Sequence, residues 1–124
     1  MSKHYDFLKD CGAFIVISQN GDFPAGRPFA AVMEDDEYLY LSTHTGNQAH
    51  KQIRKNGNIQ ILALKQNTRK WLRITGYATE CSDSNMKLKM FKTCPELKKH
   101  FSSENAKNFI LFKVKIIQTE FKGD

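Results

Sequence analysis

The segment GRPFAAVMEDDEYLYLSTHTGNQAHKQIRKNG, residues 26–57, decides the fold because its apolar pattern changes period partway along. Residues 27–34 and 38–43 have the apolar and aromatic content of strands, and the polar DDE sequence between them predicts a turn. From residue 46 onward Ala49 and Ile53 follow helical spacing, and the Asn-Gly pair at 56–57 is typical of a helix end. We therefore expect two antiparallel strands followed by a helix of two to three turns, over residues 46–55.

The residues before this segment add a further strand and a short helix. Residues 13–19, AFIVISQ, form an apolar and β-branched run, and the NGD sequence at 20–22 is a turn signal. The three strands 13–19, 27–34 and 38–43 are then expected to form an antiparallel meander. The YDFLKDCG sequence at 5–12 predicts a leading helix that ends at its glycine.

The residues after the segment predict three more strands, at 58–65, 70–81 and 108–123. Gly76 lies inside the second of these and indicates a bulge or a close backbone approach. Residues 82–101 have a helical pattern that Pro95 interrupts. The sum is a mainly β chain, a six-stranded antiparallel barrel with flanking helices, since closure of a sheet removes its exposed edges.

Length and composition limit the class of protein. The chain has 124 residues, which predicts one domain spanning residues 1–124. A hydrophobic content of 40% with 26% charged residues is ordinary for a soluble protein. No apolar run approaches the ~20 residues that a membrane helix needs, and the N-terminal residues lack the apolar core of a secretory signal. We therefore expect a cytoplasmic protein with no membrane partner.

The formal net charge of +6 favours an anionic partner, but the lysines are spread along the chain among acidic residues. No zinc-finger, helix-turn-helix or RNA-recognition pattern occurs, so no nucleic-acid partner is expected. The four histidines lack the spacing of a metal site, and no metal is predicted. The three cysteines form no CxxC pair and are expected to be reduced thiols that are buried or half-buried.

One group of residues has the chemistry of an anion site. Arg27 begins a predicted strand, and Ser42 with Thr43 ends the next one, so an antiparallel meander would bring them together. A helix N-terminus follows, with Lys51 one turn inside it, and these donors suit a phosphate. The alternative is that the threonines cap the helix and Arg27 is a solvated surface charge. Trp71 is expected in the core or, as the alternative, at an edge that faces a planar ligand.

Three blocks of the sequence, GRPFAAV, LYLSTHTGNQAHKQIRKNGNIQI and RKWLRITGYA, together resemble the pyridoxamine-5'-phosphate-oxidase-like flavoproteins. The resemblance spans about residues 8–121 and is greatest to the short branch that includes nitroimidazole-resistance reductases and general-stress flavoproteins. It implies a split β-barrel that forms a homodimer and binds FMN at the subunit interface. The vitamin B6 oxidases themselves also carry a C-terminal block with a tryptophan and an arginine, which this sequence does not contain, so that activity is not expected.

The resemblance assigns roles to particular residues. Arg27 is implied to serve the phosphate and ribityl end of FMN, while the following backbone lies against the flat ring. The strand end and the helix start complete the phosphate pocket, and Trp71 reaches the flavin from the second subunit. Many short members carry a lysine where this chain has Asn47. The implied cofactor-binding residues are Arg27, Pro28, Phe29, Ala30, Ala31, Val32, Ser42, Thr43, Asn47, Gln48, Lys51 and Trp71.

These expectations lead to a functional hypothesis. The chain is predicted to be an FMN-dependent oxidoreductase that reduces a small acceptor, such as a nitroaromatic or a quinone, with a nicotinamide donor. Since the flavin carries the redox chemistry, no catalytic side chain is predicted. The alternative is a flavin or haem carrier or sensor on the same barrel, without turnover.

Overall fold

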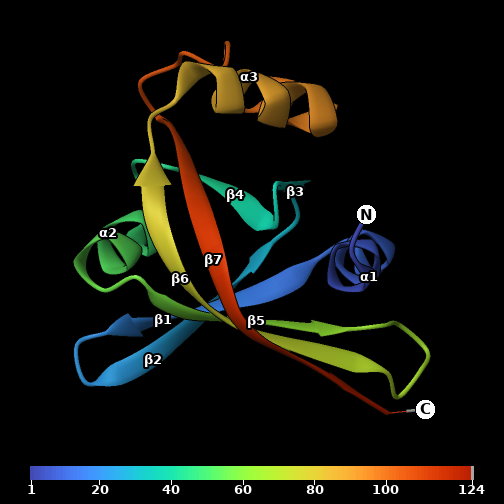
Figure 1. Ribbon diagram of the computed structural model, residues 1–124. Coiled ribbons are helices and arrows are strands. Elements are labelled where there is room, and N and C mark those ends of the chain that lie inside the picture. The colour runs from blue at the N-terminus through green and yellow to red at the C-terminus, as the bar shows by residue number, and fades with distance from the viewer. Residues whose placement is uncertain (124) are drawn as a thin grey trace.

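The computed structural model describes residues 1–123 and contains, within them, one antiparallel sheet of seven strands in the order β2-β1-β5-β6-β7-β4-β3 (Figure 1). The strands are β1 (Phe14–Asn20), β2 (Phe23–Phe29), β3 (Val32–Asp35), β4 (Tyr38–His44), β5 (Asn58–Leu64), β6 (Trp71–Cys81) and β7 (Phe109–Lys122). The helices are α1 (Lys3–Cys11), α2 (Gln48–Lys55), α3 (Ser84–Thr93) and the short 3₁₀ helix η1 (Pro95–Lys99). The prediction of a mainly β, antiparallel fold with flanking helices is confirmed, with seven strands in place of six.

The extra strand arises because the predicted strand 27–34 is divided. β2 starts earlier, at Phe23, and ends at Phe29, while β3 resumes at Val32. β2 pairs only with β1, as suits an edge strand in which Pro24 and Pro28 have no N–H to offer a second neighbour. The predicted three-strand meander is therefore wrong, because β2 and β3 lie at opposite ends of the strand order.

This topology makes the sheet curl on itself. Only Ala30 and Ala31 connect β2 to β3, so the two edges of the seven-stranded sheet must approach each other there. Figure 1 shows the long β6 and β7 crossing from the lower hairpins to the α3 end of the molecule. The register of these two strands shifts between Thr75 and Gly76, which confirms the predicted bulge. A Cβ atom at Gly76 would lie 2.7 Å from the carbonyl oxygen of Lys115, so only glycine fits this crossing.

Two clusters of buried side chains hold these elements. The barrel core lies inside the curled sheet and takes in α1 and α2; its fully buried members include Leu8, Phe14, Leu39, Leu41, Ile61, Leu72 and Ile74. The second cluster lies under α3 and η1 and consists of Met33, Tyr40, Met90, Phe91, Cys94, Leu97, Phe101, Phe109 and Leu111. β4 and β7 separate the two clusters, because alternate side chains along these strands point to opposite faces.

The predicted helices are present with small shifts of their ends. Asn47 caps α2, with its side-chain Oδ1 accepting from the backbone N–H of Ala49 at 2.9 Å. Asp83 caps α3, and Pro95 separates α3 from η1 as the sequence predicts. Gly12 ends α1 with a positive φ of 80°. Among the described residues, no helix has the length and apolar character needed to span a membrane.

Candidate ligand-binding site

A hollow of about 510 Å³ lies where the β2–β3 connection faces the end of β4 and the start of α2. We call it the Ala30 hollow. Seven of the residues that the sequence placed in the site line it: Pro28, Phe29, Ala30, Ala31, Ser42, Thr43 and Asn47. The remaining lining residues are His44, Glu96, Leu97, His100, Phe101 and Asn108.

The strand pairing explains why these segments meet. Val32 pairs with Leu41 at the start of the β3–β4 ladder, so the connection before Val32 runs beside Ser42 and Thr43. Ala30 and Ala31 belong to neither strand, and their methyl side chains leave space above the backbone. β4 then leads directly into α2, whose free N–H groups lie at its N-terminal end. The hollow therefore combines this pair of small residues, which we call the alanine strip, with hydroxyl and amide donors.

Arg27 contacts the start of α2, although not by the predicted route. It lies in the middle of β2, opposite Val16, and β2 is not adjacent to β4. Its long side chain reaches Asn47, where Nη1 donates to Oδ1 at 2.7 Å, and Nη2 donates to Oε1 of Gln52 at 3.3 Å. Ser18 donates to the same Gln52 oxygen at 3.2 Å. The alternative of a solvated surface charge does not hold, because Arg27 is half-buried and bonded.

The Nε of Arg27 is buried and makes no hydrogen bond with the described residues. A buried donor without a partner is costly, and most such groups are paired with protein, water or ligand. Oδ1 of Asn47 already accepts from both Arg27 and Ala49. Asn47 is therefore both the cap of α2 and the acceptor for Arg27. Thr43 is buried, at 6% exposure, and lies on the wall of the Ala30 hollow.

Five of the predicted residues do not line the Ala30 hollow, and Arg27, which contacts Asn47 on its wall, is one of them. Lys51 lies in a separate hollow of about 500 Å³, which we call the Lys51 hollow and which Thr45, His50, Lys51, Arg54 and Lys55 line. Gln48 is exposed and lines neither hollow. Val32 is fully buried in the barrel core and does not line the hollow. Trp71 is at the far end of β6, where it pairs with Leu64 and Lys122.

The Lys51 hollow is basic but has one acidic neighbour. His50 is buried, and its Nε2 lies 3.0 Å from Oε1 of Glu80 on β6. Nε of Arg54 lies 3.5 Å from the same oxygen. Lys51 and Lys55 make no ion pair with any described residue, so their charges remain available to an anion. The two hollows lie beside the same stretch of chain, because Thr43 and Asn47 line the first hollow and Thr45 and Lys51 line the second.

The sequence reasoning did not identify the wall that η1 contributes. Glu96, Leu97, His100 and Phe101 all line the Ala30 hollow, and they come from a segment predicted only as an interrupted helix. From the sequence the histidines were assessed as metal ligands, and none of them was placed in the site. Their position depends on how α3 and η1 pack on β4 and β7, which no local pattern encodes. Pro95 was the one available signal, because it forces the chain to turn there.

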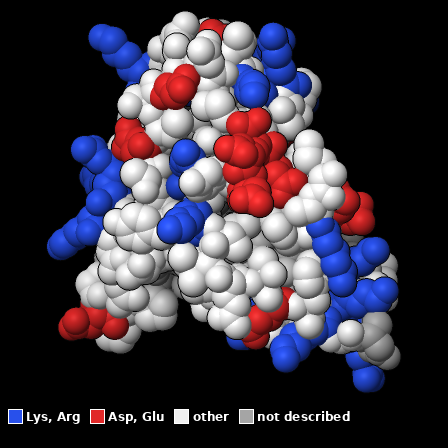
Figure 2. All heavy atoms as spheres, in the orientation of Figure 1, with Lys and Arg blue, Asp and Glu red and all other residues white. Residues whose placement is uncertain are grey.

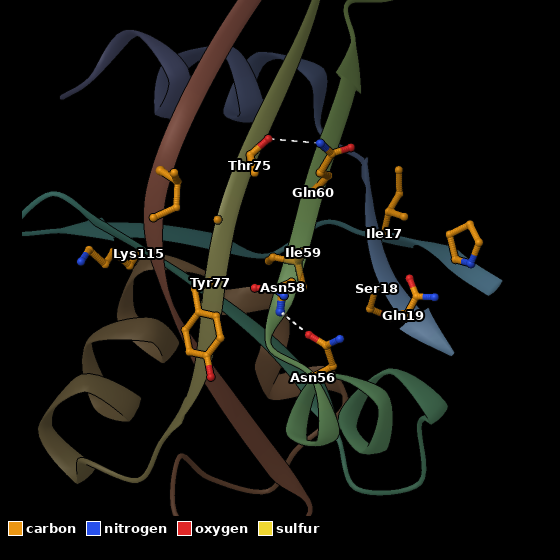
Figure 3. A pocket seen from close by; sticks show the side chains of 13 residues that line it. Ile17, Ser18, Gln19, Asn56, Asn58, Ile59, Gln60, Thr75, Tyr77 and Lys115 are labelled. Atoms are coloured by element: carbon orange, nitrogen blue, oxygen red, sulfur yellow. Dashed lines mark hydrogen bonds between the residues drawn. The ribbon is translucent and has the colours of Figure 1, made fainter. Parts of the chain in front are cut away.

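The largest hollow, about 860 Å³, is a shallow face of the sheet that β1, β5, β6 and β7 form (Figure 3). Figure 3 shows Tyr77 and Gln60 lying along this face, with Gln60 bonded to Thr75 at 3.1 Å. Tyr77 and Ile117 line the face and are 51% and 63% exposed. Two large side chains on such a surface are unusual for a free sheet face, and they mark it as a candidate protein interface.

A further hollow of about 700 Å³ lies at the β3–β4 turn, where Glu34, Asp35, Asp36 and Glu37 line it. Figure 2 shows Lys and Arg in several separate groups on the visible face, with an acidic group between them. Cys11 and Cys81 are half-buried and Cys94 is buried, all as free thiols, which confirms that prediction. Within residues 1–123, no cluster of three or more His, Cys, Asp or Glu side chains has the geometry to hold a metal ion.

Comparison with known proteins places the chain in a family. The family model described as pyridoxamine 5'-phosphate oxidase matches residues 1–123. A NimC/NimA family protein from Clostridium acetobutylicum has a TM-score of 0.84 and 26% identity, covering 96% of this chain and 88% of that one. General stress protein 26 from Bacillus anthracis has a TM-score of 0.79 at 18% identity, covering 97% and 95%. No protein with a curated description matches significantly.

Two further solved structures share the fold and differ in ligand. A pyridoxamine 5'-phosphate oxidase-related, FMN-binding protein from Nostoc punctiforme has a TM-score of 0.74 and 17% identity, covering 91% of this chain and 75% of that one. The haem storage protein HutZ from Vibrio cholerae has a TM-score of 0.77 and 11% identity, covering 98% and 92%. The same architecture therefore occurs in proteins described as binding FMN and as storing haem.

Proposed function

The chain belongs to the pyridoxamine 5'-phosphate oxidase family, and we propose that it is a flavoprotein that binds FMN in the Ala30 hollow. The observation that carries the proposal is the convergence there of three segments, the β2–β3 connection, the β4 end and the start of α2. These are the segments on which the resemblance placed the cofactor. The FMN-binding protein from Nostoc punctiforme supports a flavin on this fold.

The residues present fit the two ends of FMN. The strip of Pro28, Phe29, Ala30 and Ala31 is small enough for a flat ring to lie against its backbone, which continues into Val32. Ser42, Thr43 and the start of α2 offer hydroxyl and N–H donors to the phosphate and ribityl groups. Arg27 has a buried Nε without a protein partner, and such a donor suits an anion.

A phosphate at the start of α2 would draw on two cations. Arg27 approaches from β2 through Asn47, while Lys51 approaches from the neighbouring hollow. Gln48 is exposed at the first turn of the helix and supplies an amide. Asn47 brings hydrogen-bonding capacity but no charge, in contrast to the lysine of many short relatives. We propose that Lys51 supplies the charge that Asn47 does not.

We also propose that the protein is a homodimer, with the sheet face of Figure 3 inside the interface. The exposed Tyr77 and Ile117 on that face support this assignment. Trp71 lies far from the Ala30 hollow of its own chain and would approach the flavin of the second subunit. Light scattering should give twice the chain mass, and Tyr77→Glu should lower it toward one chain. A monomeric wild-type protein at micromolar concentration would exclude the dimer.

The proposed activity is reduction of a small acceptor, such as a quinone or nitroaromatic, with electrons from a nicotinamide donor. FMN would supply the hydride transfer, and the chain would bind it, orient it and limit access of water. No side chain is required to act as acid or base in that transfer. The three free thiols are compatible with a cytoplasmic location, which we also propose.

A second candidate is a carrier or sensor that holds a flavin or haem without turnover. His44 and His100 both line the Ala30 hollow, and imidazole is a common axial ligand of haem iron. HutZ shares the fold.

Two measurements separate the enzyme from the carrier. The visible spectrum of the purified protein, with mass spectrometry of the released ligand, distinguishes FMN from haem, and NADH or NADPH oxidation with an added quinone reports turnover. Absence of flavin absorbance after incubation with excess FMN would defeat the proposal.

A further inference from the structure

The Ala30 hollow has a second wall that the proposed cofactor site does not use. One wall is the sheet side, from Pro28 to Ala31 and from Ser42 to His44. The other is the η1 wall, which we define as Glu96, Leu97, His100 and Phe101. A flat ring against the alanine strip would have its other side open toward η1. The acceptor that takes electrons from the ring can therefore approach along this wall.

The η1 wall is held firmly in place. Leu97 and Phe101 are 5% and 8% exposed. The centroid of the Phe101 ring lies 4.9 Å from the centroid of the Phe109 ring. Successive 3₁₀ bonds join Leu97 N to Cys94 O and His100 N to Leu97 O, at 3.1 and 3.0 Å. The two apolar residues anchor the turn, so the backbone that carries Glu96 and His100 is held at the hollow.

Cys94 ties this wall to the alanine strip. Its Sγ donates to the carbonyl oxygen of Val32 at 3.5 Å, directly after Ala31. Burial raises the pKa of the Cys94 thiol, which keeps it protonated as a donor at neutral pH. The separation between the strip and η1 is therefore fixed by a buried contact rather than by a surface loop.

The polar groups of the wall are available for binding. Neither Glu96 nor His100 makes a side-chain hydrogen bond or an ion pair with any described residue, and both are exposed. His44, on β4, and Asn108 also line the hollow. Lys98 and Lys99 are exposed on the same element but do not line the hollow. Inside the hollow, Glu96 is the one carboxylate among the lining residues.

We infer that the η1 wall recognises the acceptor, and that this acceptor is a flat, uncharged or cationic molecule rather than an anion. The inference rests on the proposed flavin site, since it assigns the space beside the ring. Glu96 disfavours a negative charge near it, and His100 donates a hydrogen bond to a carbonyl or similar oxygen on the bound molecule. Both residues determine specificity and take no part in binding FMN.

Three ligands of nearly equal shape test the inference without turnover: benzamide, benzamidinium and benzoate. Their binding to the flavin-loaded protein at pH 8, where free imidazole is neutral, is measured by ligand-observed NMR and by the shift of flavin absorbance. Wild-type protein should bind benzamide and benzamidinium more tightly than benzoate. Glu96→Gln should reduce the preference of benzamidinium over benzoate by about two- to fivefold, the size expected for one solvent-accessible charge.

Two variants complete the design. Glu37→Gln removes an equal charge from the exposed β3–β4 turn, away from the hollow, and should leave the preference unchanged. His100→Ala should weaken benzamide binding by about fivefold, as loss of one neutral hydrogen bond predicts, and should leave the affinity for FMN unchanged. Because both η1 side chains are exposed, these variants should fold, and circular dichroism checks this.

The outcomes are distinct. A wild-type preference for benzoate, or equal preferences in wild type and Glu96→Gln, would overturn the inference while leaving the flavin site standing. Equal changes in Glu96→Gln and Glu37→Gln would also overturn it, because the effect would then be one of net charge. Failure of wild-type protein to bind FMN would defeat the proposed function instead. In that event the same three ligands, added to the protein as isolated, would still test the wall.

Discussion

Arg27 and Lys51 are both cations that the sequence assigned to one phosphate, yet the structure gives them different surroundings. Arg27 is half-buried on β2, and its guanidinium donates to Asn47 at 2.7 Å and to Gln52 at 3.3 Å. Lys51 is exposed on α2, in a hollow of its own, without an ion-pair partner among the described residues. Arg27 is therefore part of the protein's internal packing, whereas Lys51 is a surface residue.

The difference shows that residue type alone does not define a ligand contact. A guanidinium presents its donors in a fixed planar arrangement, so it can hold Asn47 and Gln52 and still leave Nε free. An exposed ammonium is a mobile point charge that salt screens strongly. We therefore expect Arg27 to affect both flavin affinity and protein stability, and Lys51 to affect flavin affinity alone.

The largest effect is expected for Arg27→Ala. Loss of a charge-assisted contact costs ~1.5–3 kcal/mol, which corresponds to about a 10- to 100-fold weaker FMN affinity. The variant also leaves Asn47 and Gln52 without their donor, so the free energy of unfolding of the flavin-free protein should fall by about 1 kcal/mol. Fluorescence titration with FMN and urea unfolding measure the two quantities.

Arg27→Lys is the matched control for this variant. It keeps the charge but loses the planar pair of donors, so it should recover part of the FMN affinity and little of the stability. Unchanged FMN affinity in Arg27→Ala would remove Arg27 from the site. An unchanged free energy of unfolding would instead show that the hydrogen bonds to Asn47 and Gln52 make no net contribution to stability. Arg27 and Lys51 would then no longer differ in their effect on stability.

An intermediate effect is expected for Asn47→Asp, which separates capping from flavin binding. Aspartate retains the oxygen that caps α2 and pairs with Arg27 as an ion, so stability should be equal or slightly higher. Its negative charge beside a phosphate should weaken FMN binding about 5- to 20-fold, by analogy with the loss of a charged contact.

Asn47→Ala, which loses the cap, should lower the free energy of unfolding by about 1 kcal/mol. Tighter FMN binding by Asn47→Asp would place the phosphate elsewhere.

The fold was largely predictable because strand and helix periods are local properties. The alternation of residues 58–64 and the helical spacing of Ala49 and Ile53 gave correct elements, and Gly76 gave a correct bulge. The division at Ala30 and Ala31 was missed, because an apolar run has no marker where strand pairing stops. Pro24 and Pro28 did carry a signal for an edge strand, and this would have excluded the central place that a meander gives to β2.

The site was predictable only on its sheet side. Ser42, Thr43 and Asn47 stand close to the alanine strip along the chain, and one β4–α2 connection brings them together. Glu96 and His100 are about 50 positions away from that connection. They reach the hollow because Leu97 and Phe101 pack into the second cluster, which is a tertiary event. The separate Lys51 hollow could not be predicted for a similar reason, since a one-turn spacing does not fix which side of a helix faces a hollow.

A smaller effect is expected for Lys51→Ala, about two- to fivefold in FMN affinity, as for a solvent-exposed charge pair. Because the ammonium is exposed, the loss should shrink at high salt, and the free energy of unfolding should not change. Titrations at low and high ionic strength measure this dependence. Lys92→Ala, on exposed α3, is the control for net charge. An effect as large as that of Arg27→Ala, or one that salt does not alter, would contradict the proposed division between the two cations.

The smallest effect is expected for Trp71→Phe, at about two- to threefold in FMN affinity, the size of one lost aromatic contact. Trp71 pairs with Lys122 at one end of β6, with the Arg73 guanidinium 5.1 Å from its ring, and it does not line the Ala30 hollow. Any effect on FMN affinity must then come through the second subunit.

In a Tyr77→Glu background that disrupts the dimer, Trp71→Phe should have no further effect on FMN affinity. The two changes should therefore be non-additive, as expected for residues coupled through one interface. An equal effect of Trp71→Phe in monomer and dimer would mean that it acts within its own chain, and would remove this residue from the proposed shared site.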